Sequence, residues 1–102
     1  MMVYNKLVRD KIPEIIRSQG GTPQTRILEK QEYTACLEGK LDEEVSEFHR
    51  DRNLEELVDI LEVVYALAED MGSTRQELER IYDRKHAARS GFRERIFLIS
   101  KE

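Results

Sequence analysis

The chain has 102 residues, a length that fits one domain, residues 1–102, with a small core. Charged residues make up 37% of it and hydrophobic residues 39%, a balance that suits helices with one solvated face or an oligomer. Few glycines and prolines argue against fibrous and disordered classes, and the net charge of −4 argues against a nucleic-acid partner. The one cysteine, Cys36, excludes an internal disulfide, which is compatible with the cytoplasm.

The sequence predicts no segment that enters or crosses a membrane. The opening stretch, MMVYNKLVRDKIPEII, lacks the apolar core of a signal peptide. The most apolar run, around residues 60–68, contains Glu62 and is too short to span a bilayer. We therefore expect a cytoplasmic protein without a membrane partner.

One short helix is predicted near the start of the chain, between two less regular segments. Residues 2–12 should be extended or irregular. Pro13 is best placed in the first turn of a helix that runs to about residue 19, because proline lacks the backbone N–H that a helix interior needs. Gly20 and Gly21 then end this helix, and residues 22–28 are expected to be extended.

Two longer helices are predicted next, over about residues 30–49 and 54–71. On the first, Leu37, Leu41 and Phe48 recur at helical spacing. The short sequence RDRN separates the two helices and makes them antiparallel neighbours. The second is apolar around more than half of its girth, which is typical of a central helix. Its main stripe consists of Leu57, Ile60, Leu61, Val64, Leu67, Ala68 and Met71.

A fourth helix and a short strand complete the prediction. Gly72 ends the third helix, and the capping box from Thr74 to Glu77 begins the fourth, which fades near residue 90. The tail FRERIFLIS is a candidate strand that would pair with TRIL, residues 25–28. The fold class is therefore all-α, a compact antiparallel bundle of three to four helices with a short terminal strand pair.

Acidic side chains interrupt the apolar pattern of the two long helices. On a helical wheel, Glu44 falls inside the apolar stripe, Glu47 lies at its edge, and Glu43 points away. Glu56 and Asp59 repeat the three-residue spacing on the next helix and border its apolar surface. Because the two helices are neighbours, these two pairs of carboxylates are expected to converge across one groove.

Clustered acids near a core either raise their own pKa values or bind a cation. Oxygen ligands favour Mg²⁺ or Mn²⁺ over zinc. A ferritin-like di-iron site is not expected, because His49 follows Glu47 at the wrong spacing and His86 stands apart. Cys36 is a better candidate for the core than for a nucleophile. The alternative that the acids form an ordinary solvated face stays open at this point.

The same motifs resemble a known family, the all-α nucleoside triphosphate pyrophosphohydrolases. These include MazG-like proteins, dimeric dUTPases and phosphoribosyl-ATP pyrophosphohydrolase. The segments LDEEVSE and EELVDIL carry the four acids, while YNKLVRDKIPEII and RKHAARSGFRERIFL resemble a compact, phosphoribosyl-ATP pyrophosphohydrolase-like branch. The chain departs from the family in three ways. The gap between the acid pairs is shorter than in typical MazG proteins, RSGF replaces the usual RGGF at Arg89 to Phe92, and Asp83 stands where many relatives carry asparagine.

The resemblance implies a Mg²⁺-dependent hydrolase that cleaves a nucleotide between its α and β phosphates, with Mn²⁺ as a possible substitute. It implies at least a homodimer. Alternatives from other classes are a non-catalytic nucleotide-binding or helical interaction module, and a structural protein with a solvated acidic face. The implied metal ligands are Glu44, Glu47, Glu56 and Asp59, with Glu44 or Glu47 as catalytic base, and the implied phosphate-binding residues are Lys6, Arg9, Lys11, Lys85 and Arg89.

Overall fold

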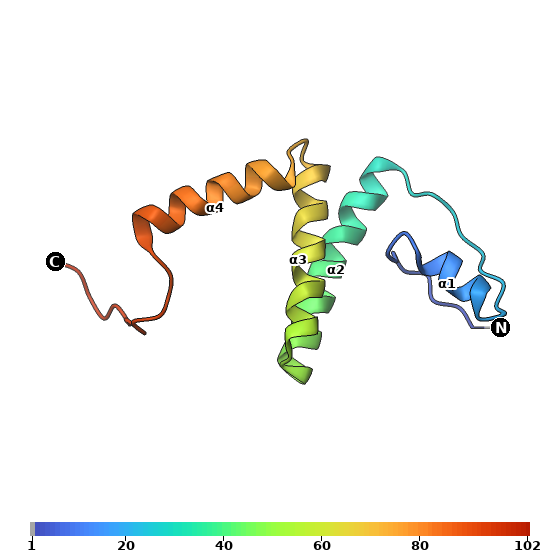
Figure 1. The fold of residues 1–102 in the computed structure, drawn as a ribbon, viewed down its shortest axis with the longest axis horizontal. Helices are drawn as coiled ribbons and strands as arrows, with labels where there is room; N and C mark the ends of the chain where they lie inside the picture. The colour runs from blue at the N-terminus through green and yellow to red at the C-terminus, as the bar shows by residue number, and fades with distance from the viewer. Residues whose placement is uncertain (1) are drawn as a thin grey trace.

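The computed structural model describes residues 2–102, and the regular structure in this range is entirely helical (Figure 1). This confirms the all-α fold class. The helices lie in an elongated molecule with extents of 61 × 32 × 23 Å. They are α1 (Ile12–Ser18), α2 (Lys30–Asp51), α3 (Leu54–Asp70) and α4 (Arg75–Arg89).

Side-chain caps explain where the long helices begin. Glu29 and Glu32 form a reciprocal capping box at the start of α2. The side chain of Asn53 accepts a hydrogen bond from the Glu56 backbone N–H at 2.9 Å, and Thr74 does the same for Glu77 at 3.0 Å. The predicted cap at Thr74 is therefore confirmed. These caps satisfy backbone donors that have no partner within the first helical turn.

Several helix ends differ from the sequence prediction by one or two residues. Helix α1 begins at Ile12, before Pro13, with Lys11 as its N-cap. Helix α2 continues to Asp51, so the turn to α3 consists of Arg52 and Asn53. Arg52 adopts a left-handed backbone conformation, with φ of 48°, which reverses the chain abruptly. This tight reversal is what sets α2 directly against α3.

The core lies between α2 and α3, which run side by side in Figure 1. Leu37 from α2 and Val63 and Ala68 from α3 are its most buried apolar side chains. At the end of the pair away from the turn, Lys30 donates a hydrogen bond to the carboxylate of Asp70. The α2–α3 hairpin is thus the rigid unit on which the acidic residues are mounted.

The predicted apolar stripe of α3 is only partly covered. Helix α2 packs on the side of α3 that carries Val63, while Leu57 and Leu61 stay 41% and 47% exposed. The neighbouring Leu54 and Val58 are also exposed. These four residues, Leu54, Leu57, Val58 and Leu61, form what we call the bare stripe. Ala68 of the predicted stripe is therefore buried, as is Val63 beside it, whereas Leu57 and Leu61 of the same stripe are not.

The single chain is less compact than the helical bundle that the sequence predicted. Helix α4 leaves α3 at a wide angle and, within residues 2–102, contacts α3 but not α2 (Figure 1). The radius of gyration is 18.0 Å, against about 13 Å for a compact domain of this length. Beyond α4, the side chains of Phe92 and residues 96–99 are almost fully exposed. Much apolar surface therefore has no cover within the chain.

The expected terminal strand pair is not confirmed. The part of the chain that the structure describes contains no strand. Residues 25–28 lie before α2, at one end of the molecule, and residues 92–100 follow α4 at the other (Figure 1). The two segments are therefore out of reach of each other within one chain.

Among residues 2–102, every helix falls short of the length or hydropathy that a membrane span requires.

Candidate metal centre

Carboxylates from α2 and α3 meet in two overlapping groups. Glu44 of α2 and Glu56 and Asp59 of α3 each offer an oxygen, and these oxygens lie within 4.8 Å of one another. The same criterion joins Glu44 to Glu43 and Glu47. Glu44 therefore links the two groups. We refer to these five residues, Glu43, Glu44, Glu47, Glu56 and Asp59, as the acidic cluster.

Burial makes two oxygens of the acidic cluster unusual. Glu44 is 8% exposed although its side chain is ionisable. Its Oε2 and the Oε2 of Glu56 are buried and accept no hydrogen bond within the described part of the chain. A buried polar atom without a partner costs free energy, and native proteins generally avoid it. Hard oxygen atoms of this kind are the ligands that Mg²⁺ and Mn²⁺ prefer, so the donor set fits such an ion.

The surroundings shift the acidity of the same two residues. Burial, followed by the nearby carboxylate of Glu47, raises the pKa of Glu44 above its ordinary value. Burial also raises the pKa of Glu56, with further contributions from Glu47, Asp51 and Asp59. In both cases the cause is the absence of enough positive charge around a desolvated carboxylate. A divalent cation would remove that imbalance.

One lysine compensates the acidic cluster in part. Lys40 Nζ lies 3.6 Å from Glu44 Oε1 and 3.5 Å from Glu43 on the same face of α2. Glu43 therefore turns towards the cluster, which corrects the expectation that it points away. The helical wheel records the direction of Cα–Cβ, whereas the flexible Glu43 side chain bends towards Lys40. The i, i+3 spacing of Lys40 and Glu43 was the sequence signal for this contact.

A guanidinium from the N-terminal segment stands beside the cluster. Arg9 Nη1 lies 3.6 Å from Asp59 Oδ1, and Arg9 Nη2 donates a 2.7 Å hydrogen bond to Glu62 Oε1. Arg9 is thus the predicted phosphate-binding residue that the structure brings to the acids. Sequence reasoning did not single out Glu62, although its spacing of three from Asp59 puts both carboxylates on one face of α3.

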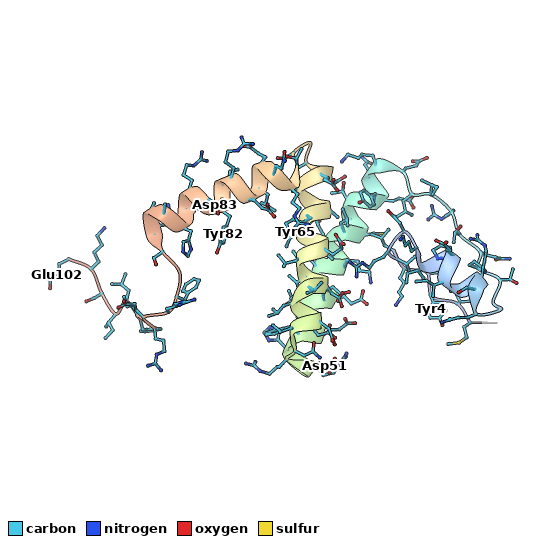
Figure 2. All side chains as sticks on the ribbon, in the orientation of Figure 1. Tyr4, Asp51, Tyr65, Tyr82, Asp83 and Glu102 are labelled. Atoms are coloured by element: carbon cyan, nitrogen blue, oxygen red, sulfur yellow. The ribbon has the colours of Figure 1, made fainter. Side chains whose placement is uncertain are left out.

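The other predicted phosphate-binding residues lie elsewhere in the chain. Lys6 Nζ is 5.8 Å from the ring centre of Tyr4, and Lys11 is the N-cap of α1. Lys85 and Arg89 line a hollow of about 510 Å³ near the end of α4. Figure 2 shows Tyr82 and Asp83 of α4 well apart from Asp51 at the turn end of α2. Lys85 and Arg89 therefore do not join the acids of their own chain.

The histidines and the cysteine occupy ordinary structural surroundings. His49 stands near Phe48, with ring centres 6.0 Å apart, and His86 stacks on Tyr82 at 5.7 Å. Cys36 is half-buried on α2. Neither the histidines nor the cysteine belongs to the acidic groups described above.

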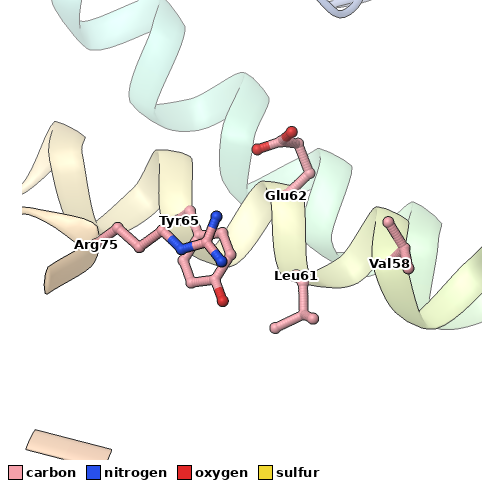
Figure 3. Close-up of a pocket in the computed structure, with 5 residues that line it drawn as sticks. All are labelled: Val58, Leu61, Glu62, Tyr65 and Arg75. Atoms are coloured by element: carbon pink, nitrogen blue, oxygen red, sulfur yellow. The ribbon is translucent and has the colours of Figure 1, made fainter. Parts of the chain in front are cut away.

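A second hollow, of about 200 Å³, lies on the bare side of α3. Val58, Leu61, Tyr65 and Arg75 line it together with Glu62 (Figure 3). The Arg75 guanidinium covers the Tyr65 ring at 4.2 Å. Leu61 and Glu62 project from opposite sides of α3 in this view. The lining of this hollow is mixed, since the apolar side chains of Val58 and Leu61 stand beside the charged groups of Glu62 and Arg75.

The comparisons with known proteins do not indicate a function for this centre. No protein-family model matches the chain, and no solved structure matches it. A stretch of 42 residues is 60% identical to an uncharacterized protein from Mycolicibacterium smegmatis (strain ATCC 700084 / mc(2)155). The match covers 41% of this chain and 43% of that relative, so the similarity extends over less than half of either.

Proposed function

We propose that the protein is a Mg²⁺-dependent nucleotide pyrophosphohydrolase. It would cleave the bond between the α and β phosphates of a nucleoside triphosphate or phosphoribosyl-ATP-like nucleotide and release a monophosphate and pyrophosphate. The observation that carries this proposal is the meeting of oxygens from Glu44, Glu56 and Asp59, where Glu44 and Glu56 each have one buried oxygen that accepts no hydrogen bond in the described chain. The resemblance of the two acidic motifs to MazG-like proteins supports the same reaction.

The acidic cluster supplies the ligands in this proposal. Glu44, Glu47, Glu56 and Asp59 would hold Mg²⁺, or Mn²⁺ in its place, and Glu43 lies close to Glu44 and Glu47. When bound, the ion would neutralise charge on the phosphates and make a water more acidic. The buried Oε2 atoms of Glu44 and Glu56 support this role because nothing in the described chain satisfies them.

The chain's own residues would orient the nucleophile and the phosphates. Glu44 or Glu47 is the candidate base, accepting a proton from the attacking water. Arg9 would hold a phosphate oxygen, since a guanidinium donates through two parallel N–H groups. Phosphoryl transfer depends mainly on such positioning and charge neutralisation.

The large surface of the single chain supports a homo-oligomer. The accessible surface is 9703 Å², whereas a compact folded protein of 12.0 kDa exposes about 6,000 Å². The excess is of the size that permanent subunit interfaces bury, about 2,000–5,000 Å² in total. The bare stripe of α3 and residues 96–99 supply exposed apolar side chains for such an interface. A second copy of this chain is therefore the proposed partner.

Charge distribution indicates which parts of the two copies would face each other. Residues 30–70 carry 13 acidic and 4 basic side chains, while residues 75–102 carry 8 basic and 5 acidic ones. Opposite charges of this kind orient association between surfaces. In this arrangement α4 of one copy would lie towards the α2–α3 hairpin of the other. Lys85 and Arg89 would then reach phosphates held at the partner's acidic cluster.

A pyrophosphate-release screen tests the proposed function. The panel should contain standard, modified and phosphoribosyl nucleotides, each with Mg²⁺ and with Mn²⁺. We expect release from at least one nucleotide, with loss in Glu44→Gln and no loss in Glu38→Gln. Glu38 is an exposed residue of the same helix outside the cluster, so it controls for the change of charge. Absence of release from the whole panel would contradict the proposal.

The same panel separates the alternative roles. A non-catalytic nucleotide-binding module would be stabilised against heat by a nucleotide without releasing pyrophosphate. A protein whose acids merely form a solvated face would show no thermal shift with Mg²⁺ or Mn²⁺, and Glu56→Gln would change little. The buried oxygens of Glu44 and Glu56 favour the metal-dependent roles over the last one.

A further inference from the structure

We propose that Glu62 is a positioning residue that holds the Arg9 guanidinium at the acidic cluster for contact with phosphate. This inference rests on the proposed function and adds to it a residue outside the metal-ligand motif. Arg9 and Glu62 are 53 positions apart, and their 2.7 Å hydrogen bond joins the segment before α1 to the middle of α3. Within residues 2–102, α1 packs against none of the longer helices, so this contact is a main attachment of the segment.

Asp59 and Glu62 lie on one face of α3 and have different roles in this proposal. Asp59 belongs to the group of acids whose oxygens converge, whereas Glu62 belongs to neither acidic group. A cation at the cluster would therefore engage Asp59 and leave the bond between Glu62 and Arg9 intact. Glu62 thus keeps the guanidinium next to the ion without competing for it.

Arg9 retains donor capacity in this position. A guanidinium carries five N–H donors in a planar fork. Glu62 accepts from Nη2, while Nη1 lies 3.6 Å from Asp59, which is longer than a hydrogen bond. Nη1 can therefore donate to another oxygen, and a phosphate beside a metal ion presents one. The Arg9 guanidinium is held by Glu62 and lies beside Asp59, so it is pre-organised to donate to a phosphate oxygen.

A purely structural ion pair would behave differently. Both side chains are more than half exposed, and pairs of that kind contribute about 0–1 kcal/mol to stability. A structural role would therefore show as a small change in melting temperature and nothing else. A positioning role predicts weaker phosphate binding that depends on the presence of Arg9.

The test measures binding of inorganic tripolyphosphate in the presence of Mg²⁺, by calorimetry, to the full chain. We expect Glu62→Gln to weaken binding about tenfold, the loss of one charge-assisted contact. Glu69→Gln, the same change on an exposed residue of α3, should have no effect. In an Arg9→Gln background, Glu62→Gln should add nothing, because its effect passes through Arg9. Equal effects of Glu62→Gln in both backgrounds, or unchanged binding, would overturn the proposal.

A second measurement separates this inference from the proposed function. Amide hydrogen exchange of residues 6–11 should be faster in Glu62→Gln than in wild type or Glu69→Gln, while the Mn²⁺ dissociation constant stays within about twofold of wild type. Unchanged exchange would overturn the positioning role even in an active enzyme. Faster exchange and weaker tripolyphosphate binding in a protein that releases no pyrophosphate would overturn the proposed reaction and leave the role of Glu62 standing.

Discussion

Lys40 Nζ approaches Glu44 Oε1 to 3.6 Å, while the other oxygen of Glu44 is buried without a hydrogen bond in the described chain. The lysine therefore compensates only one oxygen of the buried Glu44 carboxylate. The other oxygen, Oε2, destabilises the metal-free protein and at the same time offers a ligand to a hard cation. Stability and metal binding should consequently respond in opposite directions to changes at Glu44.

The first prediction concerns Glu44→Gln in the presence of a chelator. Burial raises the pKa of Glu44, so at neutral pH the wild-type fold carries a charge that its surroundings disfavour. The neutral variant should melt at a higher temperature than wild type near pH 7.5. The difference should shrink as pH falls towards about 4.5, the ordinary value, because the wild-type carboxyl is then protonated. Differential scanning calorimetry measures this directly.

Added Mg²⁺ should reverse that order. Wild type should gain melting temperature with increasing Mg²⁺, whereas Glu44→Gln should gain little. Glu38→Gln serves as the control and should follow wild type throughout. A Glu44→Gln variant that melts lower than wild type in chelator at neutral pH would show that the buried oxygen is satisfied by other means.

The second prediction concerns the clamp between the ends of α2 and α3. Lys30, followed by Thr34, hydrogen-bonds to Asp70 and holds the pKa of Asp70 below its ordinary value. Asp70 therefore stabilises the fold above pH of about 3.8, and this contribution is lost as pH falls below that value. Asp70→Asn should lower the denaturation midpoint at pH 7, and the gap to wild type should narrow as pH falls below about 3.8. A gap independent of pH would contradict the ion pair.

The third prediction concerns the hairpin core. Leu37 is 3% exposed, the lowest value among the buried core residues. Leu37→Ala should cost about 2–5 kcal/mol of unfolding free energy, because it leaves a cavity between α2 and α3. Ile27→Ala, at a position that is 94% exposed, should change it by less than about 0.5 kcal/mol. Urea unfolding followed by circular dichroism compares the two, and equal costs would show that α2 packs elsewhere.

The fourth prediction concerns the bare stripe. Leu57→Glu combined with Leu61→Glu should reduce the solution mass to that of one chain, 12.0 kDa, measured by light scattering. A glutamate at either position would be buried when two chains associate, and nothing would compensate the desolvation of its charge. Binding of Mn²⁺ should persist, since the acidic cluster lies within one chain. A wild-type protein that is itself monomeric would contradict the proposed interface.

Complementation gives the fifth prediction, on residues supplied by a partner copy. Glu44→Gln and Lys85→Ala should each lose pyrophosphate release. If Lys85 acts on the partner's acids, an equimolar mixture exchanged through mild denaturant should recover about a quarter of the wild-type activity, because half of the dimers then hold one intact site. A mixture that stays inactive would indicate that both residues serve the same chain, and full activity of Lys85→Ala alone would show that Lys85 has no part in the site.

Local patterns predicted the helices well. Apolar spacing and caps such as Thr74 placed all four helices within two residues of the observed ends, because these signals act within a single turn. The meeting of Glu44 with Glu56 and Asp59 also followed from the pattern, since a short turn leaves two amphipathic helices little choice but to pack.

Contacts that depend on side-chain reach or on distant segments were not predictable in the same way. Glu43 bends towards Lys40, which a wheel drawn through Cβ positions does not show. The contact of Arg9 with Glu62 joins segments that no local pattern connects. The direction of α4 was also open, because its sequence contains few apolar side chains that would fix it against α2 and α3.

The central claim is that carboxylates from α2 and α3 hold one divalent cation, and Mn²⁺ titration by calorimetry tests it most directly. We expect wild type to bind Mn²⁺, Mg²⁺ to compete for the same site, and Glu56→Gln to weaken binding at least about tenfold, while Glu55→Gln, the exposed neighbour on α3, keeps it. Mn²⁺ binding of equal strength in wild type and Glu56→Gln, or no binding to wild type, would contradict the account.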